Sequence, residues 1–177
     1  MVENAAVACY AVISYIVFPV QYFLTGIGEG VQPLISFYHG AKKEMEVRAV
    51  KKIAYTAEII FGITAAAVTI CMIPYIGGWF GLSAESKQCF SSGMLISSFA
   101  FLLTGTAKLN VSCLNAVMQT KKAVFMTYIE SLAVSPICLF LLPAVWDIRG
   151  IWLALPVTAG IMTGIYGLIR KDRKNEE

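Results

Sequence analysis

The sequence predicts an all-α integral membrane protein with five transmembrane helices. Of its 177 residues, 58% are hydrophobic and 14% are charged, whereas a soluble domain has about 45–50% and 25%. The apolar residues gather into long runs, and the basic residues concentrate in the connections that would lie on one side of a membrane. A chain of this composition cannot cover itself with a polar surface, which excludes an ordinary soluble domain.

A helix needs about 20 predominantly apolar residues to cross the hydrocarbon core of a bilayer. The runs are too long and continuous for transmembrane strands, whose side chains alternate between polar and apolar. They predict a single transmembrane domain over residues 1–177, with spans at about 5–37, 53–76, 89–118, 123–146 and 150–169.

The distribution of basic residues predicts the orientation of the spans. The first connection, the third connection and the C-terminal tail hold most of the Lys and Arg: Lys42, Lys43, Arg48, Lys51, Lys52, Lys121, Lys122, Arg170, Lys171, Arg173 and Lys174. Because basic loops stay in the cytoplasm, we expect a multi-pass cell-membrane protein whose C-terminus is cytoplasmic. Trp79, Trp146 and Trp152 would form an aromatic belt at the opposite interface. An external N-terminus before an odd number of spans leads us to expect that preceding helices are missing.

The first span is longer than a bilayer requires, since 33 residues (5–37) at about 1.5 Å each give roughly 50 Å. Its second half contains residues that weaken a helix or remove a backbone donor: Gly26, Gly28, Gly30, Gln32 and Pro33. We expect the helix to bend or partly unwind there. The bend would line a transport cavity, or it would be a simple kink with close helix packing.

The third span carries a polar stripe. At 100° per residue its polar side chains fall within an arc of about 80°: Ser97, Thr104, Lys108, Ser112, Asn115 and Gln119. A charged side chain near the middle of a membrane rarely faces lipid. We therefore expect this stripe to face a hydrated cavity or a polar core.

Four charged residues lie at comparable depth from the basic ends of their helices: Glu29, Glu58, Lys108 and Glu130. Glu58 is the shallowest, so its carboxylate is expected to reach the interface by snorkelling. Lys108 and Glu130 stand on consecutive antiparallel helices, and a paired charge is much less costly than an isolated one. We predict that Lys108 pairs with Glu130, with Glu29 as the second choice of partner.

Three stretches of the sequence carry a family resemblance: residues 26–43, which are the most specific, residues 114–123, and residues 129–136 together with 150–156. The glycine-rich run from Gly26 to Gly30, then Gln32-Pro33, then His39-Gly40-Ala41-Lys42-Lys43 resembles a recurring signature of the MATE (multidrug and toxic compound extrusion) family. The resemblance implies helices eight to twelve of a twelve-helix, two-lobe antiporter, with the N-terminal lobe and the first helix of this lobe missing. Relatives usually carry a neutral residue at the position of Glu29, and many carry Arg at the position of Glu130. Some place an acidic cation-site residue near Lys108, which this sequence lacks.

The resemblance implies a secondary transporter that exports cationic or amphipathic drugs in exchange for protons or sodium. The predicted substrate or cation pathway contains Glu29, Lys108, Ser112, Asn115 and Glu130. A lipid or polysaccharide flippase of the same superfamily and a non-transporting membrane subunit stay open as alternatives. We expect no enzymatic activity, because the spans hold neither Asp nor a His cluster. We also expect no metal, no resident cofactor and no nucleic-acid partner; the expected partners are membrane lipids, small organic cations and the missing lobe.

Overall fold

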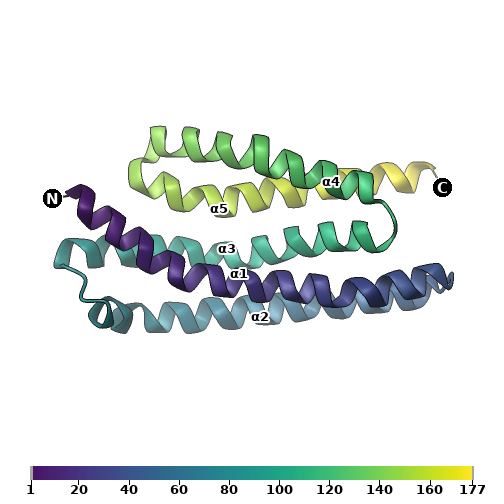
Figure 1. The fold of residues 1–177 in the computed structure, drawn as a ribbon, viewed down its shortest axis with the longest axis horizontal. Coiled ribbons are helices and arrows are strands. Elements are labelled where there is room, and N and C mark those ends of the chain that lie inside the picture. The colour runs from purple at the N-terminus through teal and green to yellow at the C-terminus, as the bar shows by residue number, and fades with distance from the viewer. Residues whose placement is uncertain (1, 177) are drawn as a thin grey trace.

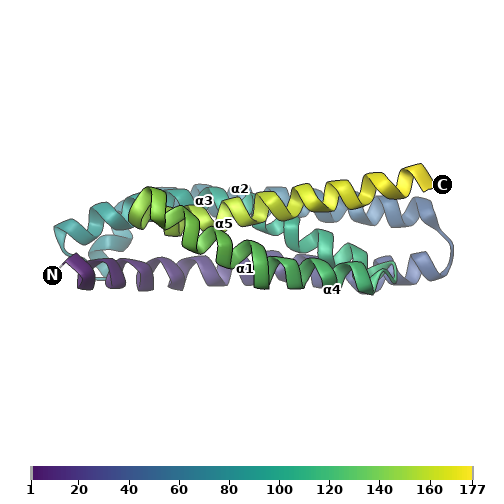
Figure 2. The same ribbon diagram turned by 90° about the horizontal axis from the view of Figure 1, so that it is seen from above.

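The computed structural model describes the backbone of residues 2–176 and the side chains of residues 7–83 and 86–169. Within these residues every regular element is helical, which confirms the predicted all-α class. The elements are α1 (Val2–Gly40), α2 (Glu44–Trp79), α3 (Ala84–Ala116), α4 (Thr120–Tyr128), the π-helix η1 (Ile129–Val134) and α5 (Ser135–Glu176). They form an elongated bundle whose helices run along its long axis (Figures 1 and 2).

Four described helices are long and apolar enough to span a membrane. The fourth, Thr120–Ile169, is 50 residues long and contains a chain reversal, because Trp146 and Asp147 have non-helical backbone angles. Its two arms run side by side in Figure 1 and cover the predicted spans at 123–146 and 150–169. The count of five separate spans stays a prediction.

The reversal in α5 depends on two residues with unusual backbone requirements. Asp147 has a φ of 48° and a ψ of −136°, a combination that residues other than glycine rarely adopt. Gly150 lies against the preceding arm, so a Cβ atom there would be 2.2 Å from the carbonyl oxygen of Leu142. The two arms approach this closely because residue 150 has no side chain.

Helix α3 is the centre of the bundle and packs against α1, α2 and α5. Glycines line several of these contacts. A Cβ atom on Gly28 of α1 would be 3.0 Å from Ser112 Oγ on α3, and one on Gly62 of α2 would be 3.4 Å from Leu102. Small residues let membrane helices approach closely, where packing rather than the hydrophobic effect holds them together.

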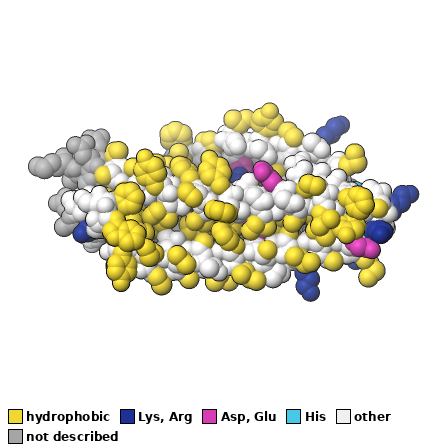
Figure 3. Space-filling view, turned by 60° about the horizontal axis from the view of Figure 1, so that its bottom comes forward, with side chains coloured by type: hydrophobic (Ala, Val, Ile, Leu, Met, Phe, Trp, Pro, Cys, Tyr) yellow, Lys and Arg dark blue, Asp and Glu magenta, His cyan; other side chains and the backbone are white. Residues whose placement is uncertain are grey.

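The basic connections lie at one end of the bundle. Figure 1 places the α1–α2 turn, the α3–α4 turn and the end of α5 together, and Figure 3 shows Lys and Arg side chains at that end beyond a largely hydrophobic flank. The predicted grouping of Lys42, Lys43, Lys121 and Lys122 is therefore confirmed. The side chains of Arg170, Lys171, Arg173 and Lys174 fall outside the described residues, and the cytoplasmic orientation stays a prediction.

The prediction of an aromatic belt formed by the three tryptophans is partly wrong. Trp79 and Trp146 are exposed, but Trp152 is only 4% exposed and belongs to the core. Its ring stacks on Tyr10 with the centroids 5.5 Å apart. Gly93 on α3 makes room for it, since a Cβ atom there would be 2.7 Å from the indole.

Helix α1 continues without interruption through Gly26–Pro33. The expectation of an unwound segment there is therefore wrong for this conformation. Pro33 removes only one backbone donor and stands on an exposed face, so the helix tolerates it. Gly28 is buried against α3, in accord with the close-packing alternative. A role of this stretch in gating stays a prediction.

Candidate functional site

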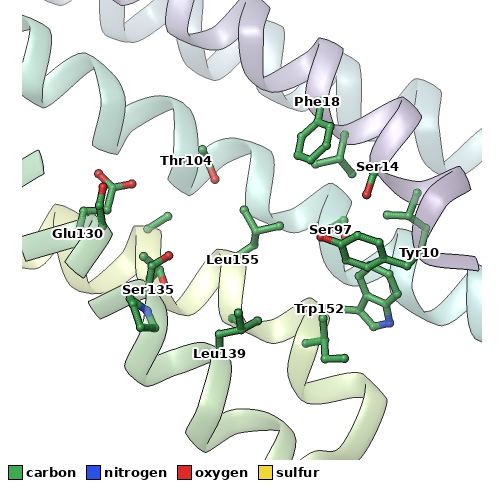
Figure 4. Close-up of a pocket in the computed structure, with 18 of the residues that line it drawn as sticks. Tyr10, Ser14, Phe18, Ser97, Thr104, Glu130, Ser135, Leu139, Trp152 and Leu155 are labelled. Atoms are coloured by element: carbon green, nitrogen blue, oxygen red, sulfur yellow. The ribbon is translucent and has the colours of Figure 1, made fainter. Parts of the chain in front are cut away.

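A cavity of about 350 Å³ lies between α1, α3, η1 and α5. This volume falls at the lower end of the range for small-molecule sites, about 300–1,000 Å³. Its walls are mostly apolar, and a few polar side chains converge on it (Figure 4). The polar members are Ser14, Ser97, Thr104, Glu130, Ser131, Ser135 and Thr158, besides the hydroxyl-bearing aromatic Tyr10.

Glu130 provides a carboxylate to this cavity and binds Lys108. Lys108 Nζ donates to Glu130 Oε1 over 2.8 Å, which confirms the predicted ion pair. The side chain of Glu130 is 18% exposed and that of Lys108 is 38% exposed. Glu29, the second choice of partner, lies on an exposed face of α1. The ammonium of Lys108 thus stays partly hydrated while it neutralises a largely buried carboxylate.

The position of Glu130 depends on the π-helical turn η1. The Ser135 N–H donates to the carbonyl of Glu130, five residues earlier. Pro136 follows and has no N–H for the carbonyl of Leu132, which an α-helix would require. The wider π turn accommodates this loss, and such turns are frequent at functional sites. It places Glu130, Ser131 and Ser135 in the wall of one cavity.

The predicted polar stripe of α3 divides into two parts. Ser97 and Thr104 face the cavity, and their hydroxyl groups have no hydrogen-bond partner among the described residues. Thr158 of α5 contributes a third such hydroxyl. Ser112 instead packs against Gly28 of α1. The predicted site residues Lys108, Ser112 and Asn115 therefore lie outside the cavity lining, and α1 covers Ser112.

Aromatic side chains form the far part of the cavity. The stacked rings of Tyr10 and Trp152 both line it, and so does the half-exposed Phe18. Figure 4 shows Glu130 at one end and the Tyr10–Trp152 pair at the other, with Thr104 and Leu155 between them. These aromatic residues were not predicted from the sequence to line a site. For Trp152 the signal in the sequence is the glycine at position 93, which makes room for it.

Glu58 does not behave as predicted. It is 2% exposed, so its carboxyl group does not snorkel to the interface. The group lies between α2, Gly105 of α3 and Leu24 of α1, outside the cavity lining. The bulk of α3 and α1 closes the path that snorkelling requires. Of the predicted layer of four charges, the structure brings together only Lys108 and Glu130.

Clusters of three or more His, Cys, Asp or Glu side chains suited to a metal ion are absent from the described part of the chain. The groups at the cavity that could bind a ligand are one carboxylate and several hydroxyls, and the carboxylate of Glu130 already pairs with the Lys108 ammonium. This arrangement suits a cationic or hydrogen-bonding organic ligand.

Comparison with solved structures identifies the fold. The chain superposes on the MATE transporter VcmN of Vibrio cholerae in its bent form, with a TM-score of 0.82 and 23% identity. This match covers 95% of the present chain and 38% of that transporter. A mutant of the same transporter gives a TM-score of 0.84 at 22% identity, covering 98% of this chain and 40% of the other. The chain thus spans about two fifths of the length of these proteins.

A search of curated proteins finds no significant match. A family model does match, over residues 1–141, and it is the MatE model. That stretch is well over half of the chain and includes α1 to α4, η1 and Glu130. The chain belongs to the MatE family.

Proposed function

We propose that this chain forms part of a membrane transporter that exports cationic or amphipathic organic compounds in exchange for protons or sodium. The proposal rests on Glu130, a carboxylate paired with Lys108 at one end of an apolar, aromatic-lined cavity. The family membership and the VcmN fold support a transporter. In this proposal a second lobe covers the open side of the cavity, and the chain lies in the cell membrane with a cytoplasmic C-terminus.

The two ends of the cavity match the two ends of an amphipathic cation. A positive group would bind Glu130, because an ionised acceptor makes the strongest hydrogen bonds and ion pairs available there. An aromatic or aliphatic body would pack on Tyr10, Trp152 and Phe18, and a cation over an aromatic ring gains a further attraction. The hydroxyls of Ser97, Thr104 and Thr158, which have no partner among the described residues, offer hydrogen bonds between the two ends.

When no substrate is bound, the Lys108 ammonium pairs with the carboxylate that would bind the substrate cation. The ammonium keeps the Glu130 carboxylate paired, which avoids the cost of an isolated buried charge. Because Lys108 is 38% exposed, it can return to water when an organic cation takes its place. Exchange transport requires a group that binds either the substrate or the coupling ion, and Glu130 is suited to that role.

Binding of tetraphenylphosphonium to the chain in lipid nanodiscs tests the proposal. Glu130→Gln should weaken binding at least tenfold, about 1.4 kcal/mol. Lys108→Met should strengthen it, because a competing ammonium is removed. Glu46→Gln is the matched control: it neutralises an exposed carboxylate in the first turn of α2, outside the cavity, and should bind like the wild type.

Two results would contradict the proposal. The first is unchanged tetraphenylphosphonium affinity in Glu130→Gln. The second is preferential binding of an anionic lipid that is lost in Lys108→Met, which would favour the flippase alternative.

A further inference from the structure

Glu58 carries a buried carboxyl group that does not line the cavity. Its side chain is 2% exposed, and both carboxyl oxygens lack a hydrogen-bond partner among the described residues. It lies at the seam where α1, α2 and α3 pack together, with Oε2 placed over Gly105. A Cβ atom at residue 105 would stand 2.2 Å from this oxygen, so the absence of a side chain there provides the space.

Among the described residues, none around Glu58 offers a free charge that could balance a carboxylate there. The titratable groups within five residues of Glu58, Gly105 or Leu24 are Tyr55 on α2, Lys108 on α3, and Tyr22 and Glu29 on α1. Tyr22 is exposed. The Tyr55 hydroxyl donates to Asn110 Oδ1, and Lys108 binds Glu130. Glu29 is exposed on α1. An ionised carboxylate without a counter-ion or donor is far more costly to bury than the neutral acid.

We propose that Glu58 is a proton-binding site, which holds its proton while α2 is packed on α3 and releases it only when the two helices separate at Gly105. On release the O–H bond of the carboxyl group breaks, the proton passes to water, and a carboxylate remains. Because that carboxylate cannot return unpaired to the seam, the packed arrangement of α1, α2 and α3 is favoured at low pH.

The site adjoins the cavity through α3. Thr104 faces the cavity and the next residue, Gly105, contacts Glu58. A displacement of α3 would therefore change both environments together. The proposed proton site nevertheless depends only on the packing of α1, α2 and α3, so it can be tested independently of which substrate the cavity binds.

Infrared spectroscopy of the chain in lipid nanodiscs tests the protonation directly. At neutral pH the wild type should show the C=O stretch of a protonated carboxylic acid, and Glu58→Gln should lack it. Glu130→Gln and Glu44→Gln should retain it, because Glu130 and Glu44 are held by Lys108 and His39. Absence of the band in the wild type, or its survival in Glu58→Gln, overturns the proposal.

The pH dependence of unfolding provides a second readout that a purely structural role would not change. The packed chain would hold one proton more than the unfolded chain, so its ratio of folded to unfolded protein should fall as pH rises. The fall should approach tenfold per pH unit for one proton. Glu58→Gln keeps the shape but binds no proton, so its profile should lose this slope. Equal slopes in the two proteins would refute the proposal even where the infrared band is weak.

Deuterium exchange tests the release step. In heavy water the wild-type band should shift slowly, because the proton leaves only when the helices separate. Gly105→Ala crowds the carboxyl group and should accelerate the shift, whereas Gly26→Ala, which meets nothing within 4 Å, should not. Immediate exchange in the wild type would show that the site is open to water and would contradict the proposed gating by α2–α3 packing.

Discussion

Replacement of Gly105 by Ala adds one methyl group to the tightest part of the seam between α2 and α3. The new Cβ atom would lie 2.2 Å from Glu58 Oε2, 3.1 Å from Glu58 Cδ and 3.0 Å from Leu24 Cδ2. The first distance is far below the 3.4–4 Å of ordinary van der Waals contact. Because Glu58 is buried, its carboxyl group cannot swing into free space, so α2 must move.

Two opposing terms set the magnitude of this effect. Ala is a better helix former than Gly by about 1 kcal/mol, and overpacking of a well-packed core costs about 1–3 kcal/mol. Gly26→Ala supplies the first term alone, since its added methyl group meets nothing within 4 Å. The free energy of unfolding of Gly105→Ala should therefore be about 1–3 kcal/mol below that of Gly26→Ala.

Equilibrium unfolding of the purified chain by dodecyl sulfate in mixed micelles measures this difference, with helix content as the signal. Glu58→Ala provides the rescue, because it removes the carboxyl group that the new methyl group would strike. In the Glu58→Ala background the additional cost of Gly105→Ala should largely disappear. If Gly105→Ala equals Gly26→Ala in stability, or if its cost persists without the Glu58 carboxyl group, the assigned packing of Glu58 on Gly105 is refuted.

Two further predictions use the same unfolding assay. Lys108→Met and Glu130→Gln should each destabilise the chain by about 1–3 kcal/mol, between the values for exposed and fully buried pairs. The double variant should be milder than the sum of the two, and strict additivity would show that the pair is not coupled. Gly150→Ala should cost at least the 1–3 kcal/mol of ordinary overpacking, since its methyl group meets the Leu142 backbone at 2.2 Å. Stability equal to that of Gly164→Ala, which meets nothing within 4 Å, would contradict the packing assigned to the reversal.

Features that depend on local composition were predictable from the sequence. Hydropathy and length located the helices, and the spacing of Lys and Arg predicted which connections share one end of the bundle. The pairing of Lys108 with Glu130 also followed, because consecutive antiparallel helices and similar depth leave few other arrangements.

Features that depend on which face of a helix meets its neighbour were not predictable. Helical periodicity predicted six polar residues on one face of the third span, but α1 covers Ser112, Thr104 lines the cavity, and Gln119 lies beyond the end of α3. The burial of Glu58 depends on the missing side chain of Gly105, whose sequence number is 47 positions away. Trp152 belongs to a residue type that commonly anchors helices at the membrane interface. Its burial in the core depends instead on the space that Gly93 leaves for it.

The central claim is that the cavity recognises positive charge through Glu130. Tetraphenylphosphonium and tetraphenylborate have nearly the same shape and opposite charge, so the ratio of their affinities isolates the electrostatic contribution. We predict that the wild-type chain in nanodiscs prefers the cation, and that Glu130→Gln, which leaves the Lys108 ammonium without its partner, shifts the ratio at least tenfold toward the anion. An unchanged ratio in Glu130→Gln would contradict the claim.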